Sequence, residues 1–204
     1  MNLAPPTGQW FVADDGQRWW FDSGSIALDF AYTGGFPGPE AWELWHGPED
    51  IARWWRERFD VEVPVDEEEA VRARDLRRAI ADAVLAAAAG TAIPGGAASV
   101  IDAAAARPDV PRQLRAEPAV TCDRLLATIA RTAVAALERP ERVRVCGADD
   151  CAVMYLDISR SGNRAWCSMR RCGNRQKVRA LRARRAASET PDDGASQPRE
   201  EHHS

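Results

Sequence analysis

The chain has 204 residues, of which 45% are hydrophobic, and its 27 basic and 31 acidic side chains leave a net charge of −4. This composition is that of an ordinary globular protein with a core, and it excludes a fibrous or wholly disordered chain. No apolar run approaches the roughly 20 residues that span a bilayer, and the N-terminus lacks the pattern of a secretion signal. We therefore expect a cytoplasmic protein without membrane contact, whose five cysteines stay reduced.

The charge is divided unevenly along the chain. Residues 1–140 hold 14 Arg against 22 acidic residues, so this part has a net charge of −8. Residues 141–187 hold 11 Arg, one Lys and four acidic residues, which gives +8, and residues 188–204 carry −4. A basic module behind an acidic body indicates a polyanionic partner for that module alone.

Most of the first 140 residues show the apolar spacing and the capping residues of helices. Aromatic runs on both sides of Asp14-Asp15-Gly16 predict a β-hairpin before them. Asp66 and Glu69 form a capping box that opens the longest helix. The expected elements are a hairpin over 10–12 and 18–22, a short helix over 26–31, a loop over 32–40, and helices over 48–59, 66–89, 97–107 and 118–138. The fold class is therefore mainly α with a β-hairpin entry.

Two residue types in this body leave alternatives open. Cys122 falls on the apolar stripe of the last helix, so we interpret it as a small core residue, with a reactive or metal-bound thiol as the alternative. Several tryptophans can line a pocket for a small apolar effector, or can be ordinary core and surface side chains. These are Trp19, Trp20, Trp42, Trp45, Trp54 and Trp55.

Four cysteines form two close pairs beyond the body. Their spacing is Cys146-x4-Cys151-x15-Cys167-x4-Cys172. Two thiol pairs, joined by a connection long enough to fold back, can place four sulfurs tetrahedrally around one zinc ion. An iron–sulfur cluster and two disulfides are the alternatives.

The segments around the cysteines predict a small β-hairpin and a helix. Short strands at 143–145 and 154–156 flank the first pair, and Ser168 can cap a helix at the second. A module of this size needs metal binding to fold. Four cysteine ligands leave no open coordination position, so the zinc is structural and we expect no enzyme.

The helix after Cys167 is rich in arginine. Five of its arginines fall within an arc of about 120°, which fits contact with a nucleic acid; a solvated face paired with the acidic body is the alternative. Asn174 and Arg175 can read bases or can brace the zinc site by hydrogen bonds, and for Asn174 we favour bracing. The predicted nucleic-acid contacts are Arg171, Asn174, Arg175, Arg179, Arg182 and Arg185. A second side of the helix is predicted to pack on the zinc core; it holds Met169, Cys172, Ala180, Ala183 and Ala187.

The stretch Cys172-Gly173-Asn174-Arg175, with Trp166-Cys167-Ser168-Met169 before it and Lys177 after it, resembles the CGNR zinc-finger family. Residues 18–140 resemble the ABATE domain that usually precedes such a finger, and the segment WWFDSGSIALDF is similar to its opening. The chain departs from that opening at Tyr32-Thr33, where Asn-Thr is common. The resemblance implies a bacterial DNA-binding regulator.

Together these patterns predict three parts. They are an α-rich ABATE-like regulatory domain over 1–140, a four-cysteine zinc finger made of a β-hairpin and a basic helix over 141–187, and a disordered tail over 188–204. We expect a transcription regulator that binds DNA through the finger, while the larger domain senses a small-molecule effector or assembles a homodimer. The alternatives are an RNA-binding module that uses Trp166 for stacking, and a protein-interaction adaptor with a purely structural zinc clip.

Overall fold

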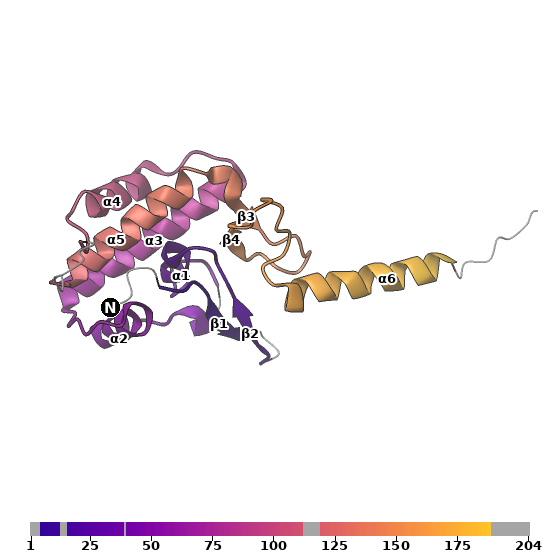
Figure 1. The fold of residues 1–204 in the computed structure, drawn as a ribbon, viewed down its shortest axis with the longest axis horizontal. Coiled ribbons are helices and arrows are strands. Elements are labelled where there is room, and N and C mark those ends of the chain that lie inside the picture. Colours follow the sequence, from indigo (N-terminus) through magenta and orange to yellow (C-terminus); the bar gives the residue numbers. More distant parts are fainter. Residues whose placement is uncertain (1–4, 13–15, 39, 112–118, 189–204) are drawn as a thin grey trace, which may run out of the picture.

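The computed structural model describes residues 5–12, 16–38, 40–111 and 119–188. A helical body carries a β-hairpin on one side and a small C-terminal module, from which one helix projects away from the rest (Figure 1). The elements are β1 (Gln9–Val12), β2 (Arg18–Phe21), α1 (Ile26–Ala31), η1 (Glu40–Trp42), α2 (Pro48–Phe59), α3 (Glu67–Ala89), α4 (Gly95–Ala105), α5 (Cys122–Leu137), η2 (Pro140–Arg142), β3 (Val143–Val145), β4 (Met154–Leu156), η3 (Met169–Gly173) and α6 (Asn174–Ser188). The predicted fold class is confirmed. The tail after residue 188 lies outside the described residues.

The N-terminal hairpin has one buried and one exposed face. β1 and β2 pair antiparallel, with Trp10 opposite Trp20 and Phe11 opposite Trp19. Because side chains alternate along a strand, Phe11, Trp19 and Phe21 enter the core while Trp10 and Trp20 face outward. The hairpin therefore lays an aromatic sheet face over the end of the body.

Local capping residues set most helix boundaries. The side chain of Asp66 accepts a hydrogen bond from the N–H of Glu69, and Glu69 accepts one from the N–H of Asp66, which confirms the predicted capping box. The start predicted for α5 at Pro118 was wrong, although residues 112–118 themselves lie outside the described part of the chain. The helix begins at Cys122 because Thr121 is its N-cap and accepts from the N–H of Arg124. α4 begins and ends two residues earlier than predicted.

The core of the body is packed by α1 to α5 and by aromatic rings. Phe30 lies 5.0 Å from Trp45 and 5.7 Å from Trp55, measured between ring centroids. Trp19 and Trp54 are buried as well, so these four tryptophans are core side chains. None of the helices in the described part of the chain is both long and apolar enough to cross a bilayer.

Cys122 is a core residue, as predicted. Its side chain is 1% exposed, and burial raises the pKa of its thiol to about 12. At neutral pH this thiol therefore stays protonated and unreactive.

The C-terminal module is attached to the body through the backbone of β4. The hydroxyl of Tyr32 donates to the carbonyl of Met154 at 2.9 Å and accepts from its N–H at 2.8 Å. The N–H of Leu156 donates to the carbonyl of Ser23 at 2.8 Å. Gly24, at φ 78°, lies so close that a Cβ on it would overlap the carbonyl oxygen of Leu156. The body and the module therefore meet in direct backbone contact, with Tyr32 as the bridge.

Candidate zinc centre and arginine groove

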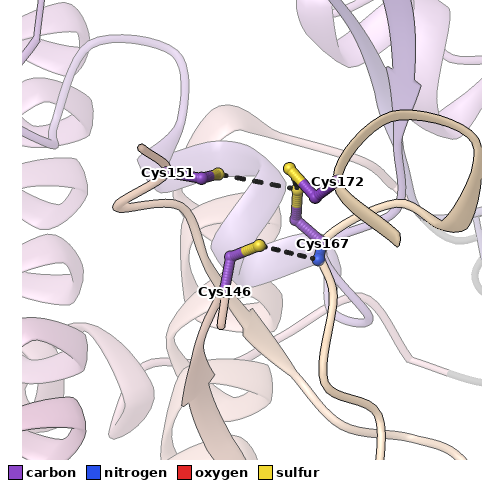
Figure 2. A group of neighbouring side chains, drawn as sticks. All are labelled: Cys146, Cys151, Cys167 and Cys172. Atoms are coloured by element: carbon purple, nitrogen blue, oxygen red, sulfur yellow. Dashed lines mark hydrogen bonds between the residues drawn. The ribbon is translucent and has the colours of Figure 1, made fainter. Parts of the chain in front are cut away.

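The four paired cysteines converge at one point. Cys146 follows β3, Cys151 precedes β4, Cys167 precedes η3 and Cys172 lies within η3. Figure 2 shows the four side chains turned toward one another, and their sulfurs all lie within 4.8 Å of each other. Three of the four cysteines are buried, and Cys151 is partly exposed. Antiparallel pairing of β3 with β4 closes the first pair of ligands, as the sequence predicted.

The spacing of the sulfurs fits a tetrahedral zinc ion. Zn–S bonds of about 2.3 Å at tetrahedral angles place the sulfurs about 3.8 Å apart. The Sγ atoms of Cys151 and Cys167 are 3.7 Å apart, and those of Cys167 and Cys172 are 3.5 Å apart. The described cysteines are unbridged, so the site is a set of free thiols and not a pair of disulfides. The protein therefore holds one structural zinc ion in a site of four cysteines.

Neighbouring groups donate hydrogen bonds to two of the four sulfurs. The N–H of Cys167 donates to the Sγ of Cys146 at 3.4 Å, and Nη2 of Arg175 donates to the Sγ of Cys172 at 3.4 Å. The contact between the two thiols lowers the pKa of Cys151 to about 5 and raises the pKa of Cys167, and burial raises the pKa of Cys172 to about 11. Four crowded sulfur atoms thus share protons in the metal-free protein, and a bound cation takes the place of these protons. A zinc ion with four thiolates has a net charge of about −2, which the guanidinium of Arg175 partly offsets.

A second set of contacts holds the loop between β4 and Cys167. Asp157 accepts hydrogen bonds from the N–H groups of Ser159 and Arg164, both at 2.9 Å. The guanidinium of Arg164 lies 4.1 Å from the ring centroid of Tyr155 and donates to the carbonyls of Asp22 and Cys167. Arg164 therefore connects the zinc site to the body as well as to its own loop. No role for Arg164 was predicted from the sequence.

Five of the six predicted nucleic-acid contacts line one groove. This groove lies between the N-terminal hairpin and the first turns of α6, and Gln17 at the hairpin contributes to it. The predicted residues in the groove are Arg171, Asn174, Arg175, Arg179 and Arg182. Arg170 and Val178 also line it, while Arg185 lies farther along α6. Sequence reasoning missed Gln17 and Arg170; the first comes from another part of the chain, and the second falls outside the helical arc.

Several of these arginines already have partners within the protein. The guanidinium of Arg171 lies 4.6 Å from the ring centroid of Trp19. Arg175 and Arg179 both contact the carboxylate of Asp150, at 2.8 and 2.9 Å. Arg182 is exposed and has no ion pair among the described residues. The groove thus contains one arginine against an aromatic ring, two paired with a carboxylate, and one without an ion pair among the described residues.

The bracing hydrogen bond that the sequence analysis favoured for Asn174 is made by its neighbour. Arg175 donates to the Sγ of Cys172, whereas Asn174 is exposed at the start of α6 and has no hydrogen-bonded side-chain partner in the part of the chain that is described. Arg175 therefore combines contact with the zinc site and a place in the groove.

The predicted packing of α6 on the zinc core was wrong. Four of the side chains predicted to pack there are described by the structure, and Cys172 is the buried one. Met169 is 51% exposed, and Ala180 and Ala183 are exposed too. The side chain of Ala187 lies outside the described residues. η3 is a wide π-type turn in place of the regular helical start expected at Ser168, and after it α6 runs away from the module (Figure 1). Alanines also offer too little apolar surface to hold a helix against a neighbour.

The helical body, the four-cysteine site and the basic helix define a zinc-finger protein with an α-rich N-terminal domain. The CGNR zinc-finger model matches residues 142–185, and the ABATE model, described as "Putative stress-induced transcription regulator", matches residues 24–140. The chain therefore belongs to the ABATE family and carries a CGNR zinc finger after its ABATE domain. These models describe a regulator and a zinc finger, not a class of enzyme. No match to a curated protein was found.

Proposed function

We propose that the protein regulates transcription by binding duplex DNA through the arginine groove and α6. The observation that carries this proposal is the groove itself, because it gathers five arginines from η3 and α6 beside the hairpin. Arginine is well suited to phosphate recognition because its planar guanidinium can donate two parallel hydrogen bonds. A polyanion is the partner that such a surface selects.

The projecting helix favours a duplex as that polyanion. α6 has 15 residues, a length of about 22 Å, and from Lys177 to Arg185 every residue is exposed. An isolated helix of this length is marginally stable in water, so α6 gains most from a partner that surrounds it. The major groove of B-form DNA is about 12 Å wide and accepts one helix.

The surroundings of Trp166 support an RNA partner less well than a DNA duplex. This ring is half-buried and packs beside Gly147 and Gly173, so little of its face is free for a base. A-form RNA also has a major groove too narrow for a helix. Single-stranded and double-stranded competitors in one assay separate the two partners.

We further propose that an effector binds in the body between α3, α4 and α5. A pocket of about 200 Å³ lies there, with the buried side chains of Leu76 and Leu126 among its lining. Asp123 at the same pocket forms ion pairs with Arg72 and Arg107, at 3.2 and 3.0 Å. Apolar walls beside a few charged groups are typical of a small-molecule site.

The DNA-binding proposal is tested with Arg182→Ala in the zinc-loaded full chain. Because Arg182 is exposed and unpaired among the described residues, its removal should leave the fold and the zinc content unchanged. The dependence of log K on log salt for duplex DNA should become shallower by about one unit, since each neutralised phosphate releases counterions. Fluorescence anisotropy across a salt series measures this slope.

Arg78→Ala is the matched control, because Arg78 is an exposed arginine on α3 of the body. We expect it to leave the salt slope unchanged. An unchanged salt slope in Arg182→Ala would show that Arg182 contacts no phosphate. If the native protein binds no duplex at low salt, the adaptor alternative replaces the proposal.

A further inference from the structure

The carboxylate of Asp150 lies between two arginines of the groove. Its Oδ1 accepts from Nη2 of Arg175 at 2.8 Å, and its Oδ2 accepts from Nη2 of Arg179 at 2.9 Å. Its neighbour Asp149 reaches only Nη1 of Arg179, at 4.0 Å, and is 88% exposed. Of these two aspartates, it is Asp150 that bridges both guanidiniums, which stand one helical turn apart.

This arrangement has the chemistry of a phosphate site. Each oxygen of one anion is bound by a separate guanidinium, as a non-bridging pair of phosphate oxygens would be. The site is also held in place, because Arg175 donates to the Sγ of Cys172 and Asp150 is the residue before the ligand Cys151. Both the anion and one of its receptors are thus attached to the zinc centre.

We infer that Arg175 and Arg179 form an oxyanion site for one phosphodiester group of a nucleic-acid backbone, and that Asp150 occupies this site in the free protein. The inference rests on the proposed function, since it names one of the contacts by which the groove binds DNA. A phosphate that enters must displace the Asp150 carboxylate from both arginines.

The internal carboxylate makes the site selective for long polyanions. Asp150 is tethered beside the two arginines, so its effective concentration there is high and a single phosphate competes poorly. A duplex makes further contacts in the groove, for example with Arg170 and Arg182, and these offset the displacement. Asp150 therefore weakens binding of every phosphate while leaving a ligand with many contacts able to bind.

The test compares Asp150→Asn with Asp149→Asn in the zinc-loaded full chain. Both variants remove one negative charge from the same loop, so general electrostatic attraction changes equally in the two. Asp150→Asn should tighten binding to a 20-base-pair duplex by roughly 3- to 10-fold, because two exposed ion pairs no longer compete. Asp149→Asn should change the affinity by less than about 2-fold. Zinc content and circular dichroism confirm that both variants are folded.

Two further measurements separate failure of the oxyanion site from failure of the DNA-binding function. In an Arg179→Ala background the gain from Asp150→Asn should shrink, because half of the site is missing. Polyphosphate serves as a probe that contains no nucleic acid. Tighter polyphosphate binding by Asp150→Asn, without duplex binding by any variant, would support the oxyanion site and refute the DNA-binding function.

Equal gains in the two aspartate variants would overturn the inference, since charge alone would then explain them. Weaker duplex binding by Asp150→Asn would overturn it as well, because Asp150 would then serve to orient the arginines for binding. In either case the native protein's own duplex binding would leave the proposed function intact.

Discussion

The helical body and the zinc finger are stabilised in different ways. The body buries complete apolar side chains on several helices, including Leu125 and Ile129 on α5. The finger has two strands of three residues each and a single fully buried large side chain, Tyr155, among its described residues. Its order depends on the metal and on hydrogen bonds to the body, because a module this small has too little core of its own. The comparison predicts that the two regions respond differently to the same kind of change.

The largest effect is expected from loss of a zinc ligand. Cys172→Ser should lose the metal, unfold the finger and abolish duplex binding, while most of the helical signal of the body remains. Metal analysis and far-UV circular dichroism measure the two parts separately. Cys122→Ala is the control, because Cys122 is a core thiol of α5 and should leave one zinc per chain. Full zinc content in Cys172→Ser would contradict the four-cysteine site.

A core truncation in the body should act in the opposite way. Leu125 is fully buried in α5, so Leu125→Ala should lower the free energy of unfolding by about 2–5 kcal/mol through lost burial and a cavity. Zinc should remain bound under conditions where the chain is still folded, since no ligand is touched. Urea unfolding followed by tryptophan fluorescence measures the loss. A change below about 1 kcal/mol would mean that this helix contributes little to the core.

A buried carboxyl in the body adds a dependence on pH. Asp29 is 0% exposed and accepts hydrogen bonds from the N–H of Gly8 and the hydroxyl of Ser23. Burial raises its pKa from 3.8 to about 6, despite these bonds and the nearby Arg58. The folded state thus favours the protonated acid, so this contribution to stability is complete below about pH 4 and is lost as the pH rises through about 6.

Asp29→Asn removes this titration. Between about pH 4 and pH 7 the stability of the variant should rise relative to the native protein by up to about 3 kcal/mol. The quantity to measure is the difference in free energy of unfolding at each pH, because loss of zinc in acid affects both proteins alike. A difference that stays constant with pH would show that Asp29 does not titrate in this range.

The smallest effect is expected at the contact between the two regions. Tyr32→Phe removes the hydroxyl that pairs with both the N–H and the carbonyl of Met154. Leaving these buried groups without a partner should cost about 1–3 kcal/mol, with zinc retained. Hydrogen exchange of the Met154 amide should accelerate more than exchange in α5. Equal acceleration in both places would mean that the body and the finger unfold as one unit.

Much of the local structure could be predicted from the sequence, because it is determined by neighbouring residues. The hairpin strands, the capping box of α3 and the strands that flank the first cysteine pair all follow from nearby signals. The start of α5 was misplaced because Pro118 and Thr121 both offer a helix start, and the hydrogen bond that Thr121 accepts from the N–H of Arg124 sets the boundary. Short-range competition of this kind is decided by geometry that a sequence pattern does not contain.

The zinc ligands, the mainly α fold and the arginine-rich helix were determined by the sequence alone, since spacing and side-chain type suffice for them. Only the tertiary structure decided which arginines are free. Asp150 occupies two of them, Trp19 contacts another, and Gln17 from the distant hairpin completes the groove. The structure also shows that α6 projects where packing was predicted. The physical reason is that helical periodicity tells which residues share a face, while contacts between distant segments decide what that face meets.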